Sequence, residues 1–591
     1  MSLAFFISFL LTTHLCTASE PVQLPAIILE ASTSEILSND PIVPTLEGGS
    51  INPNSGGGIA GDLSRKWAFS LNDGKKPGEL SQIRGYGRSA EDTEVEILGV
   101  SLNPPIGGGF SMGTFPQFIW GSYSFRPGPS LSGLDPHANS GRLSLRPWTS
   151  EALVEKQSKF MVGENYSSSE LNQIYCGFAH NQSTAIIAGM SSGKVRGPSG
   201  AFAQRFEVGE WKGKIHALAT STTATSEGSL LLPTPRATLG QKRVISVIQL
   251  DHAVGEHGLF KTSLLLDLGS VEYEDLDSVS YSTRDRSQQV GIENVWIEGP
   301  WRFGFSTRAA QYKKINFLAP NEISAHIQIN RKLESAPWLF EPTLGVTAVR
   351  GYNPSLDASL GARYKLDPFI GIFIRGTASK KYPSLQDRFY NLAPIFIGNP
   401  HLKPETDFTL YSGVDSKGLD LTNWGVQFYF QDRKEAFIQT SNTVINSGSA
   451  RLFSVMGWFN THVTEKFRIL GSSTLASSWV EADGESVPYF PKVLAVLGVQ
   501  ANFFSSYLWD QSPLKGEISA RGGWGAIAPD RLPADSGVTV EIGLRSAVYS
   551  RPNKSITLGL FLDNLTQSRL ELTRGYPIQG RSLTASLTGQ F

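Results

Sequence analysis

The feature that most constrains this chain is the length over which one β-strand pattern continues. From about Thr149 to Phe591, short runs of alternating apolar and polar residues recur between polar or glycine-rich turns, as in Ile323–Ile329 and Val426–Phe430. Alternation with period two gives each strand two faces of different polarity. About 440 residues of this pattern are too many for a single soluble β-sandwich domain. The alternation alone leaves open whether the apolar face turns inward or outward to lipid.

A second stretch, Ile83–Trp148, combines short β-prone runs with glycine or proline, which is typical of short strands joined by tight turns. Its pieces are Ile83–Gly87, Val95–Asn103, Arg126–Ser130 and Ser140–Trp148. Any one of them alone favours a small soluble α/β domain. Four in this order, ahead of the long β pattern, favour a different architecture.

Two further motifs lie in the β-rich region. Gly398–Glu405 reads Gly-Asn-Pro-His-Leu-Lys-Pro-Glu, and each of its prolines restricts the residue before it, which predicts a constrained turn entering a strand. Near the C-terminus, Leu560–Leu565 and Tyr576–Arg581 precede a last strand that ends in Phe591.

Together these motifs resemble those of TonB-dependent outer-membrane receptors, and the resemblance covers nearly the whole mature chain. It implies an all-β membrane protein: a 22-stranded antiparallel transmembrane β-barrel with a small N-terminal α/β plug domain inside the lumen. The sequence departs from the family's pattern in two places. Leu98 stands where the family usually has Asp, and Pro127 is an extra residue before Gly128-Pro129.

The resemblance divides the chain into four parts. Residues 1–19 are predicted to be a signal peptide, because the apolar run Leu3–Leu11 is followed by the small residues Thr17-Ala18-Ser19. Residues 20–61 hold a Ton-box-like segment and a linker, 62–148 the plug, and 149–591 the barrel. Of the two cysteines, Cys16 leaves with the signal peptide, so the mature chain has no internal disulfide.

The Ton-box-like segment is Ile27-Ile28-Leu29-Glu30-Ala31. In the family, such a segment pairs as a β-strand with TonB, which is coupled to an inner-membrane energy complex. The physical need is an exposed, extended, β-prone segment with free edges. An ordinary first strand is the alternative reading of these residues.

The resemblance also implies roles for single residues. Plug arginines in these motifs, here Arg84 and Arg126, meet acidic residues of the barrel wall, since buried charges must be paired. An alternative is that both arginines lie on a wet plug surface. Gly85, Gly99 and Gly128 permit turns with positive φ. Further motif residues are Asn103 and Pro129 in the plug turns, Asn399, Pro400, Lys403, Pro404 and Glu405 in the barrel motif, and Phe591, which is similar to the signal read by the outer-membrane assembly machinery.

The function that follows is energy-coupled uptake of a scarce metal complex, either cobalamin or a ferric siderophore, across the outer membrane of a Gram-negative bacterium. A plugged passive porin or a surface adhesin without energy coupling is the first alternative. An enzyme is the second, but the sequence has no HExxH metal motif and no nucleophile elbow, so we expect no catalytic residue, cofactor or resident metal. The net charge of −1 gives no support for binding nucleic acid. Tryptophans near predicted loops are either ligand contacts or membrane-interface residues: Trp211, Trp301, Trp338, Trp458 and Trp509.

Overall fold

The structure is a computed structural model. The residues it describes are 46–50, 63, 67, 70–73, 81–84, 92–104, 109–127, 141–153, 159–167, 171–180, 182–225, 236–255, 258–276, 281–314, 317–392, 396–417, 422–439, 443–464, 466–480, 486, 491–505, 513–526, 532–551, 554–573, 576–577 and 580–590. The predicted signal peptide and the segment Ile27–Ala31 lie outside this range. So do Gly85, Gly128, Pro129, Trp509 and Phe591.

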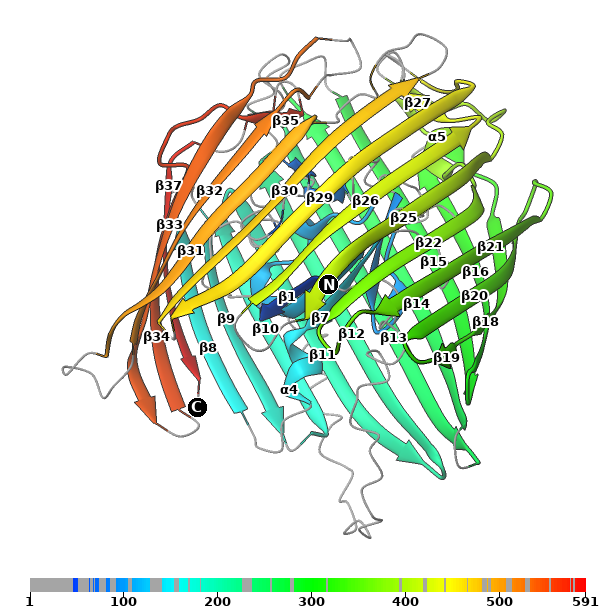
Figure 1. The fold of residues 1–591 in the computed structure, drawn as a ribbon. Helices are drawn as coiled ribbons and strands as arrows, with labels where there is room; N and C mark the ends of the chain where they lie inside the picture. The colour runs from blue at the N-terminus through cyan, green and yellow to red at the C-terminus, as the bar shows by residue number, and fades with distance from the viewer. Residues whose placement is uncertain are drawn as a thin grey trace. The chain divides into compact units, whose positions relative to one another are not determined.

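Among these residues, twenty-two long antiparallel strands form a closed barrel, as predicted (Figure 1). Each strand pairs with its neighbours along the chain, and β37 pairs with β8 to close the wall. The short β17 (Phe317–Leu318) and β19 (Leu333–Ser335) extend two of the hairpins. The long strands are β8 (Lys159–Ser167), β9 (Leu171–His180), β10 (Thr184–Gly193), β11 (Val195–Val208), β12 (Trp211–Thr225), β13 (Thr238–Val254), β14 (Gly258–Asp275), β15 (Tyr281–Glu298), β16 (Trp301–Lys314), β18 (Glu322–Arg331), β20 (Trp338–Val349), β21 (Ser355–Lys365), β22 (Ile370–Lys381), β25 (Glu405–Lys417), β26 (Thr422–Lys434), β29 (Ser449–Thr464), β30 (Phe467–Val480), β31 (Val493–Ser505), β32 (Pro513–Trp524), β33 (Gly537–Arg551), β34 (Lys554–Asp563) and β37 (Ser582–Gln590).

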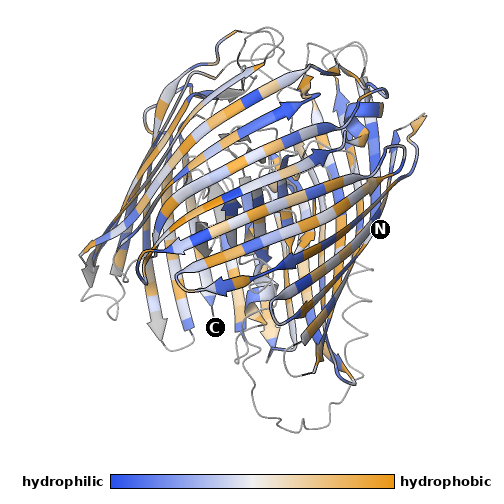
Figure 2. Cartoon of the chain, turned by 45° about the vertical axis from the view of Figure 1, so that its right-hand side comes forward, coloured by the Kyte–Doolittle hydropathy of each residue, from blue (hydrophilic) through white to orange (hydrophobic). Residues whose placement is uncertain are grey.

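The apolar face of the wall turns outward, which settles the direction that the sequence pattern left open. In β14, Leu264, Leu266 and Leu268 are exposed, while the alternating Ser263 and Asp267 are buried. The same alternation gives the strands of Figure 2 their banded colouring. Outward apolar and inward polar side chains are typical of a barrel surrounded by lipid.

The two ends of the barrel differ in the length of their connections. At one end, short turns join neighbouring strands, for example 209–210 between β11 and β12 and 299–300 between β15 and β16. At the other end, longer loops carry short elements of their own: α5 (Leu385–Phe389), β23 (Asn391–Leu392), β24 (Phe396–Ile397), β27 (Phe437–Gln439), β28 (Val444–Asn446), β35 (Glu571–Thr573) and β36 (Tyr576–Pro577). Helix α5 begins at a capping box, in which Ser384 and Asp387 each accept from the other's backbone N–H.

Three of the five tryptophans singled out from the sequence directly follow short turns. Trp211, Trp301 and Trp338 begin β12, β16 and β20 and pack against other aromatic or basic side chains. A belt of this kind is typical of a membrane–water interface. Trp458, in contrast, is buried in the core.

The N-terminal domain is a mixed five-stranded sheet in the order β1-β6-β7-β4-β5. Strands β4 and β7 pair in parallel, and the other pairs are antiparallel. The bounds are β1 (Leu46–Ser50), β4 (Thr93–Ile97), β5 (Val100–Ser101), β6 (Trp120–Pro127) and β7 (Gly141–Pro147), with a separate hairpin of β2 (Ser70–Asp73) and β3 (Ser81–Arg84), the 3₁₀ turns η4 (Met112–Thr114) and η5 (Gln117–Ile119), and helix α4 (Trp148–Ala152). The sheet begins within the segment predicted as a linker, because Leu46 is the register partner of Phe125. None of the helices in the described residues is long and apolar enough to cross a membrane.

This sheet lies against the inward-facing side of the wall, so the domain acts as a plug in the lumen. One continuous apolar core joins both parts, and it contains plug residues such as Phe125 and wall residues such as Tyr429. Phe118 stacks on Tyr175 of β9 with 5.1 Å between ring centroids. The core therefore fills the space between the sheet and the wall with side chains.

Candidate functional site

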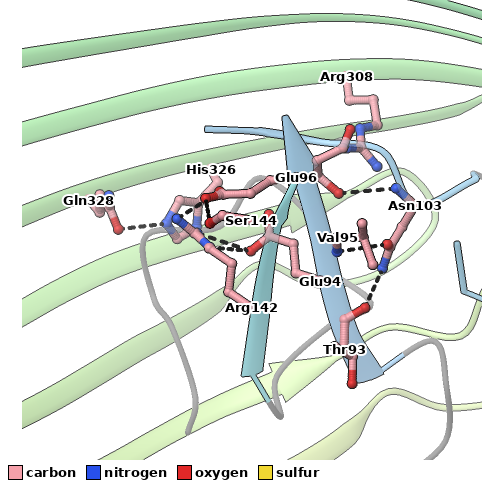
Figure 3. Close-up of polar contacts among 11 residues, drawn as sticks. Thr93, Glu94, Val95, Glu96, Asn103, Arg142, Ser144, Arg308, His326 and Gln328 are labelled. Carbon is pink, nitrogen blue, oxygen red and sulfur yellow. Dashed lines mark hydrogen bonds and ion pairs between the residues drawn. The ribbon is translucent and has the colours of Figure 1, made fainter. Parts of the chain in front are cut away.

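The best-defined polar site is the plug hairpin 92–103, formed by β4 and β5, together with the wall residues that hold it. The hairpin braces itself through Asn103. The Asn103 side chain accepts from the N–H of Val95 at 3.1 Å and donates to the carbonyl of Thr93 at 3.0 Å (Figure 3). The buried side-chain amide of Asn103 thus supplies hydrogen bonds to the β4 backbone past the end of the two-residue β5.

The turn of this hairpin has an unusual residue. Leu98 has φ of 56° and Gly99 has φ of 84°, so both lie in the left-handed region, as two-residue hairpin turns of type I′ require. Gly99 adopts this conformation freely, which agrees with its predicted role. A leucine there is strained, but its side chain packs against the core of the plug.

Four consecutive wall strands donate hydrogen bonds to main-chain carbonyls of this hairpin. Arg243 of β13 donates to Leu102 at 2.6 Å, and Lys261 of β14 donates to Leu98 at 3.3 Å. The other two donors are Gln289 of β15, to Asn103 at 3.5 Å, and Arg308 of β16, to Ser101 at 3.4 Å. These four donors therefore recognise the backbone of the hairpin.

Among these donors, Arg243 makes the shortest hydrogen bond to the plug, and other wall residues hold its guanidinium in place. Arg243 makes two hydrogen bonds to Asp267, at 3.0 and 2.7 Å, and Gln289 donates to the same carboxylate at 2.8 Å. A bidentate pair holds the guanidinium in one orientation. The Arg243 guanidinium also lies 5.1 Å from the ring centroid of Phe110 in the plug, which adds a cation–π contact.

The first residue of the hairpin is held by an ion pair. Lys381, the last residue of β22, lies 2.5 Å from the carboxylate of Asp92, and both side chains are almost fully buried. The register partner of Lys381 is Glu405, the last residue of the predicted barrel motif. Glu405 pairs with Arg433 at 3.5 Å and accepts from the N–H of Phe437. The plug thus meets the wall where the loop 382–404 begins and ends.

A second buried charge cluster lies within the plug sheet. Arg142 of β7 pairs with Glu94 at 3.0 Å and with Glu96 at 3.1 Å, and Ser144 donates to Glu96 (Figure 3). Burial alone would lower the pKa of Arg142, but the negative charges of Glu94, Glu96 and the wall residue Glu293 outweigh it and raise that pKa. The cluster fixes the parallel pairing of β4 with β7.

Of the two predicted plug arginines, the structure describes the side chain of Arg126 alone. Arg126 is buried in β6 as the register partner of Arg142. Arg84 ends β3, and its side chain is outside the described residues. In the plug–wall contacts described above, cations of the wall meet carbonyls and a carboxylate of the plug. Wall contacts of Arg84 and Arg126 stay a prediction.

The barrel motif forms a constrained turn at the long-loop end. Asn399 accepts from the N–H of His401 at 3.0 Å and donates to the carbonyl of Val444 at 3.2 Å. The N–H of Lys403 donates to Oδ1 of Asn446 at 2.9 Å, and the Lys403 side chain pairs with Glu435 at 3.4 Å. Pro400 directly follows Asn399, Pro404 directly follows Lys403, and Glu405 begins β25.

The wall donors Arg243, Lys261, Gln289 and Arg308, with Lys381, were missed in the sequence. No motif marks them. Their one signal is that each is a charged or amide residue at an inward-facing position of an alternating strand. In the part of the chain that the structure describes, no group of three or more His, Cys, Asp or Glu side chains is placed to hold a metal ion.

The fold is shared with solved structures of metal transporters and siderophore receptors. The copper transporter OprC superposes with a TM-score of 0.74 at 11% identity, covering 92% of this chain and 97% of that one. The siderophore receptor PirA from Acinetobacter baumannii gives 0.74 at 13% identity, covering 94% and 99%. The FrpB iron transporter from Neisseria meningitidis gives 0.73 at 9% identity, covering 93% and 99%. No family model and no curated protein matches the sequence.

The chain therefore has the fold of TonB-dependent receptors, a 22-stranded barrel with an N-terminal plug. The resemblance seen in the sequence motifs and the likeness in three dimensions lead to the same fold.

Proposed function

We propose that this protein is a TonB-dependent receptor in the outer membrane of a Gram-negative bacterium, and that it imports a small metal complex. The observation that carries the proposal is the plug held inside the wall by the contacts of hairpin 92–103. A plug tied in this way must be remodelled before a ligand can pass, and remodelling requires work from outside the barrel.

The class of ligand is supported by the neighbours in structure, whose names describe a copper transporter, a siderophore receptor and an iron transporter. We propose a ferric siderophore or cobalamin as the cargo. Ligand would bind at the long-loop end and at the plug surface beneath it. The receptor would make and break no covalent bond.

Energy coupling would use the segment Ile27–Ala31, which TonB would bind as an added strand. Arg84 would help to hold the plug, and Phe591 would be read during assembly. The outward apolar face is suited to outer-membrane lipid.

The decisive experiment deletes residues 24–32. We expect ligand binding to whole cells to persist while accumulation inside the cell falls to background, measured with labelled cobalamin and a panel of ferric siderophores. Deleting 35–43, in the predicted linker ahead of β1, is the control for shortening, and it should leave accumulation largely intact. Undiminished uptake after deletion of 24–32 would favour a plugged porin without energy coupling.

A further inference from the structure

The outward face of the wall carries a groove of about 420 Å³. Its lining comes from β14, β15, β16, β18, β20 and β21 and includes Phe260, Trp296, Phe303, Phe305, Ile327 and Leu344. Trp296, Phe305 and Ile327 are exposed by 42%, 42% and 58%, so the groove opens on the lipid-facing side. Its volume lies in the range of about 300–1,000 Å³ that is usual for small-ligand sites.

Two polar residues belong to this lining, Asn294 and Gln328, and Gln328 is buried. Thr262 of β14 and Asn294 of β15 are register partners, and the Thr262 hydroxyl donates to Oδ1 of Asn294. Within the described part of the chain, the two N–H groups of the Asn294 amide have no acceptor. Hydrocarbon offers none either, and an unsatisfied donor in an apolar environment is costly. The groove therefore calls for an occupant with an apolar body and a hydrogen-bond acceptor.

The depth of the groove identifies the kind of acceptor. Phe260 packs edge-on against Trp211, and Trp296 packs against Phe303, both beside short turns of the wall. Aromatic belts lie at the level of lipid headgroups, where the ester carbonyls of glycerophospholipids are found. An ester carbonyl accepts hydrogen bonds but donates none, which complements the free amide N–H groups of Asn294.

We propose that this groove binds one acyl chain of a glycerophospholipid from the leaflet on the short-turn side, with its ester carbonyl accepting from Nδ2 of Asn294. The inference uses only the membrane placement from the proposed function. It depends neither on the imported ligand nor on energy coupling.

The test titrates the full-length, delipidated protein in detergent with dioleoyl phosphatidylethanolamine and with its diether analogue, which lacks the ester carbonyls. Native mass spectrometry counts the bound lipids. We expect one tight lipid per barrel, and about fivefold weaker binding of the diether, the factor for one neutral hydrogen bond of about 1 kcal/mol. The variant Asn294→Leu should bind both lipids equally, at the weaker level.

The variant Val346→Trp fills the groove and should lose the tight site for both lipids. Leu475→Trp, at a lipid-facing position of β30 away from the groove, is the matched control and should bind as the unchanged protein does. Equal binding of ester and diether lipids by the unchanged protein would overturn the inference. So would unaltered binding by Val346→Trp, or a clear preference for lipid A over phosphatidylethanolamine. Because no readout involves uptake, a failure here is separate from a failure of the receptor proposal.

Discussion

At the scale of single residues, Leu98 shows how one side chain can be retained in an unfavourable conformation. Its φ of 56° opposes a branched apolar side chain, while its packing against the core favours one. A left-handed backbone costs a non-glycine residue about 1–2 kcal/mol, which partial burial of leucine can offset. The usual Asp of this turn would avoid the strain but forgo the packing.

This balance predicts the order of two variants. Leu98→Ala keeps the strain and loses the packing, so we expect the hairpin to be destabilised by about 1–2 kcal/mol. Leu98→Asn should cost less, because asparagine tolerates the left-handed region. Hydrogen exchange of the amides of Val95 and Leu102, which bond within the hairpin, measures both opening free energies. Equal protection in the two variants would contradict this account.

At the scale of elements, the hairpin 92–103 contacts two separate parts of the wall. Strands β13–β16 hold its turn at Leu98 and its second arm at 101–103, and β22 holds its start through Lys381 and Asp92. These contacts explain what the sequence could and could not predict. Alternation and turn residues are local, so the strands and the plug were predictable. The donors and their carbonyls are 141 to 207 residues apart, and no local pattern records such a pairing.

The Asp92–Lys381 pair gives a prediction at this scale. Lys381→Met leaves a buried carboxylate without its partner and should destabilise the plug by about 3–5 kcal/mol. The double variant Asp92→Leu with Lys381→Met removes both charges and should recover most of that loss. Urea titrations of the purified protein in detergent, followed by tryptophan fluorescence, supply the free energies for a double-mutant cycle. Additive losses would show that the two side chains do not act as a pair.

At the scale of the whole molecule, the unequal ends of the barrel define an orientation. Outer-membrane barrels have short turns on the periplasmic side and longer loops outside. The loop 382–404, with its capped helix and its Asn399–Glu405 turn, then faces the medium. The fold class was predictable from the sequence, while the wall residues that contact the plug were not, because inward positions of a strand accept either charge.

The orientation predicts which positions react with a membrane-impermeant maleimide. His401→Cys, exposed at the long-loop end, should be labelled on intact cells, whereas Glu210→Cys at a short turn should require permeabilised cells. The native Cys176 lies on the outward face of β9, between the exposed Ile174 and Phe178, so lipid should shield it in both cases. Labelling of Glu210→Cys on intact cells would reverse the orientation.

The hydrogen bonds from the wall to main-chain oxygens of the hairpin have a consequence for which residues can be replaced. Every amino acid offers the same carbonyl, so replacements at residues 98, 101 and 102 keep these hydrogen bonds as long as the backbone conformation is kept. The sequence of this hairpin can then change while the plug stays held in the barrel.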